Sequence, residues 1–383
     1  MREKPGARRR FSPFGTRTRR FTLVAGAAVL CLALVLVVLS VRPDPVPRPA
    51  SDSREVVAAL PFWNFEDGTS ALLSHTEAFT EVSPWMYGLD PRGRVVSQIP
   101  SDRAGQTRAA MNSLRGTELR FTPSIANMTH GAWSYDSVAP LLHDPERRKR
   151  HVREIVDLVL SNDYAGIDID YEELRAEDRE EFTALVRELA EALHTHDRTL
   201  SVALFAKASE RGYDERNAAQ DYAAIGRAAD QVRLMGYDRH WSTSPPGPVA
   251  PVDWIRDVLA YARETIPPDK IVLGVPLYGY DWSEGKGQPV TWGEATRIAQ
   301  RHDVRVRFDE ESRSPWFPYT DSDGTRHEVW FENSASSRAK FEMADRAGIG
   351  GVYLWMYGPA DPATWPRLRE SFPVARRSGR RRG

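Results

Sequence analysis

Eight short apolar runs, separated by segments of helical periodicity, constrain the fold of this chain most strongly. The runs are residues 56–61, 81–87, 118–125, 166–171, 200–206, 232–237, 271–277 and 351–356. Continuous apolar strands that alternate with helices are typical of a parallel sheet covered on both faces. Eight such units in about 300 residues predict an α/β fold of the (β/α)8 TIM barrel type. A doubly wound open sheet is the alternative, although no G-x-G-x-x-G follows the first run.

The interval between the last two expected strands is longer than one connecting helix requires. It predicts a helix followed by three short strands, with residues 321–324 as a hairpin turn. We interpret residues 283–333 as a small α+β insertion between strands 7 and 8. The barrel domain is expected to cover residues 53–372, and residues 373–383 form a basic tail.

The N-terminal region has the pattern of a membrane anchor. Residues 21–41 contain no charged side chain, and about 20 apolar residues suffice to cross a bilayer as a helix. The arginine-rich segment 1–20 indicates that the N-terminus lies in the cytoplasm. We therefore expect one transmembrane signal-anchor, a Pro-rich linker at 42–52 and an extracytoplasmic domain at the cell membrane. A cleaved signal peptide, with a secreted domain, is the alternative, although its apolar region would normally be shorter.

The charge of the body narrows the range of partners. Residues 51–375 hold 37 basic against 51 acidic residues, a formal charge of −14. Such an acidic surface argues against nucleic acid as a partner. All 11 tryptophans lie after residue 60, which fits either core packing or flat platforms for sugar rings. The single cysteine, Cys31, lies in the apolar N-terminal run, so the domain must fold without an intrachain disulfide.

Three acids alternate along the fourth expected strand. Asp168, Asp170 and Glu172 share one face, and the apolar residues between them share the other. Three stacked carboxylates inside a barrel are costly to desolvate, so their pattern indicates catalysis. Pairing with buried arginines and a divalent metal site are the alternatives. The histidines give no support for zinc because no H-E-x-x-H is present, and we predict no metal and no cofactor.

The acidic strand and three further segments resemble the motifs of a known enzyme family. Residues 164–173, YAGIDIDYEE, resemble the D-x-x-D-x-D-x-E signature of glycoside hydrolase family 18, the chitinase-like enzymes. LMGYD at 234–238 is similar to the family's M-x-Y-D motif, and residues 270–279 and 350–355 are similar to its last two strands. Ala165 stands where the signature begins with Asp, which puts rate and pH profile in doubt more than reaction type.

Two further segments resemble one subgroup of this family. HWSTSPPGPVAP at 240–251 and VWFENSASSRAKFEMA at 329–344 are similar to bacterial spore-germination and peptidoglycan-cleaving enzymes. The likeness covers roughly residues 54–372. It implies hydrolysis of β-1,4-linked N-acetylglucosamine glycans, with a wall glycan such as peptidoglycan ahead of chitin, because a tethered enzyme reaches nearby wall glycans better. A lectin-like wall-binding protein on the same fold and a metal-dependent transferase are the alternatives.

The resemblance also implies roles for individual residues. Glu172 would protonate the leaving oxygen, Asp170 would hydrogen-bond the acetamide nitrogen, and Asp168 would share a proton with Asp170, in a retaining mechanism assisted by the substrate. Independently, clustered carboxylates raise one another's pKa, which favours a protonated Glu172. The residues expected to contact the sugar, with barrel packing as the alternative for each, are Tyr237, Asp238, Met235 and Trp355. Residues after the first three strands that are expected to line the groove are Trp63, Tyr87 and Asn127.

Overall fold

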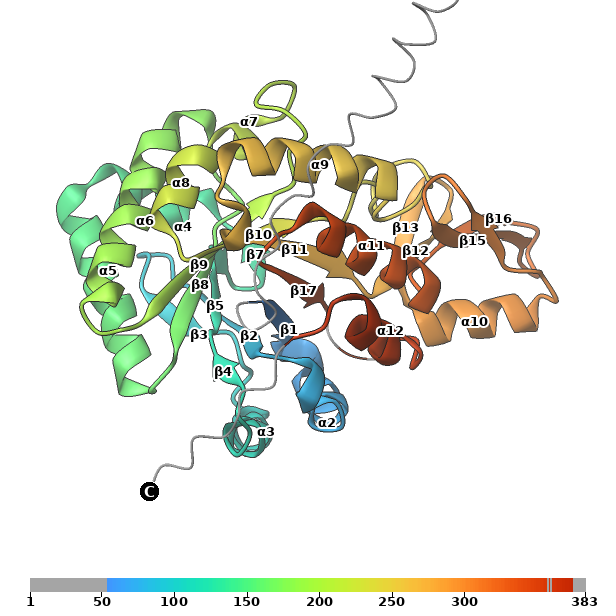
Figure 1. The fold of residues 1–383 in the computed structure, drawn as a ribbon, viewed down its shortest axis with the longest axis horizontal. Helices are drawn as coiled ribbons and strands as arrows, with labels where there is room; N and C mark the ends of the chain where they lie inside the picture. Colours follow the sequence, from blue (N-terminus) through green and yellow to red (C-terminus); the bar gives the residue numbers. More distant parts are fainter. Residues whose placement is uncertain (1–53, 357, 359, 375–383) are drawn as a thin grey trace, which may run out of the picture. The chain divides into compact units, whose positions relative to one another are not determined.

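A closed barrel of parallel strands forms the centre of the computed structural model, which describes residues 54–356, 358 and 360–374. Neighbouring strands pair in parallel in the order β1, β2, β5, β8, β9, β10, β11 and β17, and β17 pairs again with β1 (Figure 1). This closure confirms the TIM barrel. The strands are β1 (Glu55–Pro61), β2 (Glu81–Leu89), β5 (Ser124–Ala126), β8 (Gly166–Asp170), β9 (Thr199–Phe205), β10 (Gln231–Met235), β11 (Ile271–Pro276) and β17 (Gly351–Trp355).

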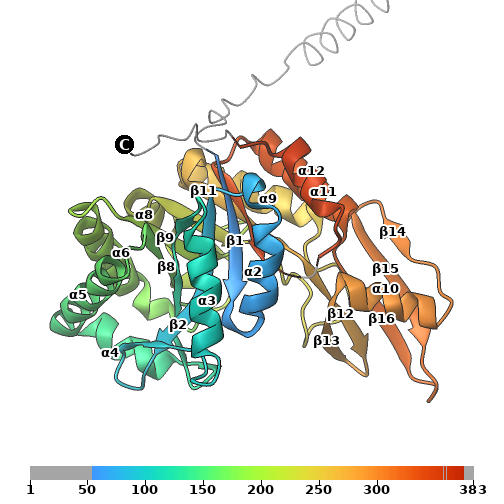
Figure 2. The ribbon, with the colours of Figure 1, turned by 90° about the horizontal axis from the view of Figure 1, so that it is seen from below.

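Helices surround this barrel (Figures 1 and 2). They are α2 (Phe65–Leu73), α3 (Ala104–Arg115), α4 (Tyr135–His143), α5 (Pro145–Ser161), α6 (Arg179–His194), α7 (Glu215–Ala218), α8 (Tyr222–Ala228), α9 (Val252–Thr265), α11 (Ser334–Ala347) and α12 (Thr364–Ser371). Helix α5 begins where the sequence signals it. The Asp144 carboxylate accepts the backbone N–H groups of Glu146 and Arg147, and Pro145 occupies the first helical position.

The third expected strand, 118–125, is broken in the structure. It forms β4 (Arg120–Phe121) and β5, and both pair with β2. The break contains Pro123, which has no N–H group to donate to a strand ladder. Short additional strands are β3 (Val95–Ser97), β6 (Met128–Thr129) and β7 (Ala132–Trp133).

The two faces of the barrel strands differ sharply in chemistry. On β8, the side chains of Ile167 and Ile169 pack into the large apolar core beneath the helices. The interior holds a small apolar group and, beside it, buried polar side chains. These interior polar residues include Glu81, Ser83, Ser124, Asp168, Asp170 and Arg233. The barrel therefore encloses charge rather than a purely apolar filling.

The insertion is a five-stranded antiparallel sheet with one helix, standing beside the barrel (Figure 2). Its elements are β12 (Tyr278–Ser283), β13 (Lys286–Thr291), α10 (Trp292–Arg301), β14 (Arg307–Asp309), β15 (Ser314–Thr320) and β16 (Arg326–Trp330). The helix and the three strands after it are as expected, but the β12–β13 hairpin was not. Only Leu277 separates β12 from the apolar run of β11, and the turn residues Glu284 and Gly285 are a weaker hairpin signal than Asn-Gly.

Within the described part of the chain, no helix combines the length and apolarity needed to span a bilayer. The predicted anchor at 21–41 lies outside the described residues, together with segments 1–20 and 42–52 and the basic tail from residue 375. The anchor and its orientation stay predictions.

Candidate active site

The alternation along β8 aims Asp168 and Asp170 into the barrel, where they are 3% and 7% exposed. Glu172 follows two residues later, at the carboxyl end of the barrel strands where TIM barrels hold their active sites. Asn127 holds this turn in place. Its side-chain oxygen accepts the Glu172 backbone N–H at 2.9 Å, and its side-chain nitrogen donates to the Glu173 carbonyl at 3.0 Å. Because Asn127 is fully buried, it supports the backbone of Glu172 rather than the surface of a groove.

Asp168 is the acid of this group that is paired with a cation. The Ser124 hydroxyl donates to Asp168 Oδ2 at 2.7 Å, and Arg233 Nη1 lies 3.5 Å from Asp168 Oδ1. The expectation that buried arginine could neutralise the acids therefore holds for Asp168. In the described part of the chain, neither Asp170 nor Glu172 forms an ion pair.

Asp170 lies next to Asp168 on the same face of β8 and has a different environment. The indole of Trp85 donates to Asp170 Oδ2 at 2.8 Å, whereas Oδ1 is buried and has no hydrogen-bond partner among the described residues. Burial, and next the charge of Asp168, raise the pKa of Asp170 to about 7. Trp85 was not anticipated from the sequence.

Glu172 is half-buried, and its carboxylate makes no hydrogen bond or ion pair within residues 54–356. Burial, and next the charge of Asp170, raise the pKa of Glu172 well above its ordinary value, and the charge of Arg216 lowers it by less. An unpaired carboxylic acid whose pKa is raised holds its proton to higher pH, and it is chemically suited to donate that proton to a bound oxygen.

Tyrosines from the end of β10, from β12 and from β17 lie beside Asp170 and Asp238. Tyr237 hydrogen-bonds through its hydroxyl to the Tyr353 hydroxyl at 2.6 Å, and its ring stacks with Trp355 at 6.4 Å between centroids. Asp238 Oδ1 accepts hydrogen bonds from the hydroxyls of Tyr278 at 2.7 Å and Tyr280 at 3.2 Å. Both of these tyrosines belong to β12, so the first strand of the insertion fixes the orientation of Asp238.

Tryptophans from several loops meet beside these tyrosines. Trp85 lies within 5.4 to 6.3 Å, between ring centroids, of Trp63, Trp133 and Trp355. Trp63 is 45% exposed and Trp133 is 37% exposed, so the cluster presents open aromatic faces as well as buried ones. Flat, partly exposed indoles of this kind suit the apolar faces of sugar rings.

Met235 was predicted to contact the sugar, and Tyr87 was predicted to line the groove. Met235 ends β10 and is only 8% exposed, so most of its surface is packed. Tyr87 hydrogen-bonds to the Tyr164 hydroxyl at 2.9 Å and its ring packs against the core beneath the helices. A register irregularity between Trp85 and Tyr87 interrupts the simple alternation of β2. The structure does not bring Tyr87 to the acids.

Ala165, the departure from the signature, lies at the opposite end of β8 from Glu172. It precedes the strand, and its backbone pairs with Phe121 and Thr199. Five extended residues span about 16 Å, so position 165 is far from Asp170. A side chain at this position would not contact a sugar held by Asp170 and Glu172.

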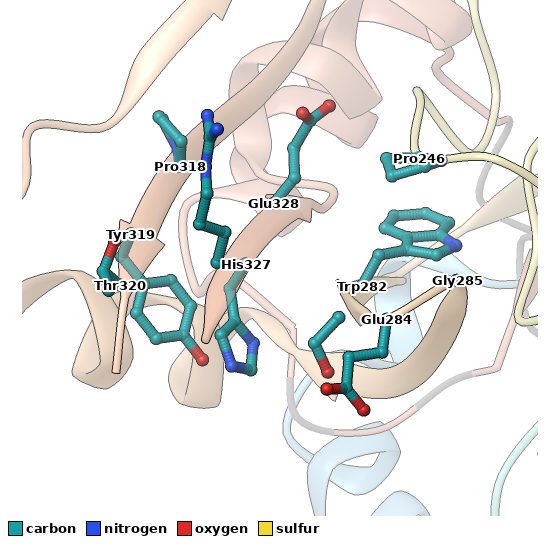
Figure 3. A pocket seen from close by; sticks show the side chains of 11 residues that line it. Pro246, Trp282, Glu284, Gly285, Pro318, Tyr319, Thr320, His327 and Glu328 are labelled. Carbon is teal, nitrogen blue, oxygen red and sulfur yellow. The ribbon is translucent and has the colours of Figure 1, made fainter. Parts of the chain in front are cut away.

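An open pocket of about 440 Å³ lies on the insertion and not at the acids (Figure 3). Its lining includes Trp282, Tyr319, His327 and Glu328 with Pro246 from the loop after β10, and none of the three acids. No cluster of three or more His, Cys, Asp or Glu suited to a metal ion occurs in the described parts of the chain.

Comparison with known proteins gives this geometry its context. Residues 70–359 match the model of glycosyl hydrolases family 18. The chain belongs to this family. The resemblance read from the four motifs is confirmed.

The chain is also similar to curated proteins of Bacillus subtilis. The chain is 34% identical over 262 residues to the cortical fragment-lytic enzyme of Bacillus subtilis, covering 67% of this chain and 61% of that enzyme. It is 32% identical over 308 residues to the putative sporulation-specific glycosylase YdhD of the same organism, covering 77% and 70%. The match thus spans less than two thirds of the cortical fragment-lytic enzyme.

Two solved structures have a similar fold. The spore cortex-lytic enzyme SleL of Bacillus cereus superposes with a TM-score of 0.76 at 28% identity, covering 86% of this chain and 77% of SleL. A chitinase from Chromobacterium violaceum superposes with a TM-score of 0.77 at 29% identity, covering 85% of this chain and all of that enzyme.

Proposed function

We propose that this family 18 hydrolase cleaves β-1,4-linked N-acetylglucosamine-containing glycans, with peptidoglycan or a related wall glycan preferred over chitin. The observation that carries the proposal is the face of β8 that bears the carboxylate side chains. It ends in Glu172, an unpaired acid with a raised pKa, next to Asp170 and the Trp85 cluster. The named activity of the cortical fragment-lytic relative supports a wall glycan over chitin.

In the proposed mechanism the substrate supplies its own nucleophile. Glu172 gives its proton to the glycosidic oxygen while the carbonyl oxygen of the N-acetyl group attacks the anomeric carbon. The glycosidic bond breaks and a positively charged oxazolinium forms. Asp170 accepts a hydrogen bond from the acetamide N–H and Tyr237 holds the acetamide in place. Glu172 then takes a proton from water, which attacks the anomeric carbon and restores the acetamide with retained configuration.

The predicted N-terminal anchor belongs to the same proposal. A single helix at 21–41 would hold the domain on the outer side of the cell membrane, next to wall glycans. An N-acetylated polysaccharide and the membrane are then the expected partners.

The test is to incubate the full chain with purified peptidoglycan and, separately, with chitin, and to identify the released fragments by mass spectrometry. We expect new reducing ends at N-acetylglucosamine, with faster release from peptidoglycan. Binding to both polymers with no fragments would instead favour a lectin-like role and contradict the proposal. A thiazoline analogue of the oxazolinium should inhibit, and indifference to it would contradict substrate assistance.

A further inference from the structure

A partly exposed arginine, Arg216, lies on α7, the short helix that follows β9. Asp214 caps this helix by accepting the backbone N–H of Asn217 at 3.2 Å. The same carboxylate holds the arginine, because its Oδ2 accepts from Arg216 Nη2 at 2.9 Å and from Nε at 3.3 Å. The guanidinium also lies over the ring of Phe205, the last residue of β9, with Cζ 5.3 Å from the ring centroid. Contacts with the protein therefore fix Arg216 on two sides.

The segment that carries Arg216 is joined to the turn that carries Glu172. Gln220, just after α7, is fully buried. Its side-chain oxygen accepts the Phe205 backbone N–H at 2.7 Å, and its side-chain nitrogen donates to the Tyr171 carbonyl at 3.5 Å. Tyr171 immediately precedes Glu172, and β9 pairs in parallel with β8. Arg216 is thus held beside Glu172, and its charge acts on that carboxyl group.

The sign of this charge does not suit the chemistry of Glu172 itself. The charges that act most strongly on Glu172 are those of Asp170, Arg216, Asp238 and Glu173, and Arg216 is the cation among them. A cation lowers the pKa of a carboxyl group, so it works against a general acid that must hold its proton. The reason for a cation at this position therefore lies outside proton donation.

Packing does not use the whole guanidinium either. The pair with Asp214 occupies Nε and Nη2, whereas Nη1 has no hydrogen-bond or ion-pair partner among residues 54–356. The Arg216 side chain is 37% exposed. Arginine presents planar N–H groups that match the oxygens of a carboxylate. The unpaired end of Arg216 is therefore suited to a carboxylate that arrives with the substrate.

The position of Arg216 indicates which sugar would carry this carboxylate. Trp85 reaches Asp170 from β2, and β2 and β9 lie on opposite sides of β8 in the strand order. In the proposed function, Asp170 holds the acetamide of the reacting sugar. Glu172 must lie between the reacting and the leaving sugar, because it protonates the oxygen that joins them. Arg216, on the β9 side, then faces the leaving sugar.

We propose that Arg216 is a specificity-determining residue that binds a carboxylate carried by the leaving sugar. This inference rests on the proposed function, and it names the feature that would distinguish a wall glycan from chitin. Every second sugar of peptidoglycan bears a lactyl group. Its carboxyl group is either free or joined to a stem peptide that has carboxylates of its own, whereas chitin has neither.

The first experiment compares kcat/KM of the full chain on two forms of one substrate. Soluble peptidoglycan strands are stripped of stem peptides by an amidase and used with free lactyl carboxylates or after conversion of these to methylamides. Arg216→Gln should reduce the preference for the free carboxylate by about 10- to 100-fold, the effect of losing a hydrogen bond between charged groups. The preference is a ratio, so a general change in catalysis cancels. An unchanged preference in a folded Arg216→Gln variant would overturn the proposal.

Arg211→Gln is the matched control, because it removes the same charge from an exposed position in the same loop. Its preference should equal that of the wild type. Arg216→Lys keeps the charge without the planar fork and should retain only part of the preference. An equal loss in Arg211→Gln would mean that the net charge of the loop attracts the strand, and would contradict a specific site at Arg216.

Strands that keep their stem peptides identify the source of the carboxylate. A preference that depends on Arg216 only in stripped strands assigns the lactyl carboxylate, and one found only in strands with stems assigns a stem-peptide carboxylate. Either result supports the proposal. If Arg216→Gln does not fold, the wild type carries the test. Equal kcat/KM on the free and methylamide forms of both kinds of strand would then refute it.

A neutral substrate separates this inference from the proposed function. The fluorogenic chitobioside 4-methylumbelliferyl N,N′-diacetylchitobioside has no carboxylate and reports turnover alone. Its turnover without any preference among the strands would refute the role of Arg216 while the proposed function stands. If no glycan is cleaved, the proposed function fails. Isothermal titration calorimetry with the two forms of stripped strand then still tests Arg216, and equal affinities would overturn its role.

Discussion

The barrel interior and the insertion both contain buried carboxylates, but the hydrogen bonding of these carboxylates differs between the two regions. In the insertion, Asp281 is 9% exposed and both of its oxygens are used: His327 Nδ1 lies 2.8 Å from Oδ1 and the Tyr319 hydroxyl donates to Oδ2 at 2.6 Å. In the barrel, Asp170 Oδ1 is without a partner in the described chain, and the Glu172 carboxylate is unpaired there. Satisfied carboxylates hold a fold together, whereas unsatisfied ones keep bonding capacity for a substrate.

The largest expected effect comes from replacing Glu172, the unpaired acid that follows β8. Glu172→Gln keeps the size of the side chain but cannot donate an acidic proton. We expect kcat on the fluorogenic chitobioside to fall by about 10² to 10⁴, with glycan binding preserved. Isothermal titration calorimetry with a chitooligosaccharide measures whether glycan binding is preserved. Turnover equal to the wild type would remove Glu172 from the mechanism.

Asp170→Asn should have the next largest effect, and it separates two roles. Loss of a negative charge opposite the oxazolinium should lower kcat by about 10². Because the charge of Asp170 helps to raise the pKa of Glu172, its removal should lower that pKa. Glu172 then loses its proton earlier as pH rises, so the basic limb of the kcat profile should move to lower pH. An unchanged basic limb would mean that the two acids are not coupled.

The sequence predicts the barrel from its apolar runs and the shared face of the acids from a period of two. Apolar runs define the strands, and alternation on β8 puts Asp168 and Asp170 on one face. Where the period is interrupted, the prediction loses its basis: Pro123 splits the third strand, and the irregularity in β2 takes Tyr87 away from the acids.

Contacts across the barrel lie beyond a single strand's pattern. The bond from Trp85 to Asp170 joins β2 to β8, which depends on the stagger of strands around the closed sheet. Arg233 did leave a signal, since it is a charged residue in an apolar run and shares the parity of Met235 and Tyr237. That parity indicates the interior, but not which acid the arginine meets.

A substitution in the insertion tests the same contrast between its satisfied carboxylate and the unpaired acids of the barrel. Asp281→Ala leaves His327 and the Tyr319 hydroxyl without their shared acceptor, and a buried group left unsatisfied costs about 1 to 3 kcal/mol. We expect the free energy of unfolding in urea to fall by about this amount, with kcat and its pH limbs unchanged. A shifted pH profile would mean that Asp281 acts on the catalytic acids as well, and the distinction between the two regions would fail.

The smallest effect should come from the edge of the tryptophan cluster. Trp133, on β7, is 37% exposed and touches the cluster through Trp85, with 6.3 Å between ring centroids. An aromatic contact is worth about 0.5 to 1.5 kcal/mol, so Trp133→Ala should raise KM for a long N-acetylated oligosaccharide by about 2- to 12-fold. kcat should hold, because Trp85 and its bond to Asp170 remain. A fall in kcat without a change in KM would instead mean that Trp133 supports Trp85, and that the open part of the cluster serves the acids rather than the sugar.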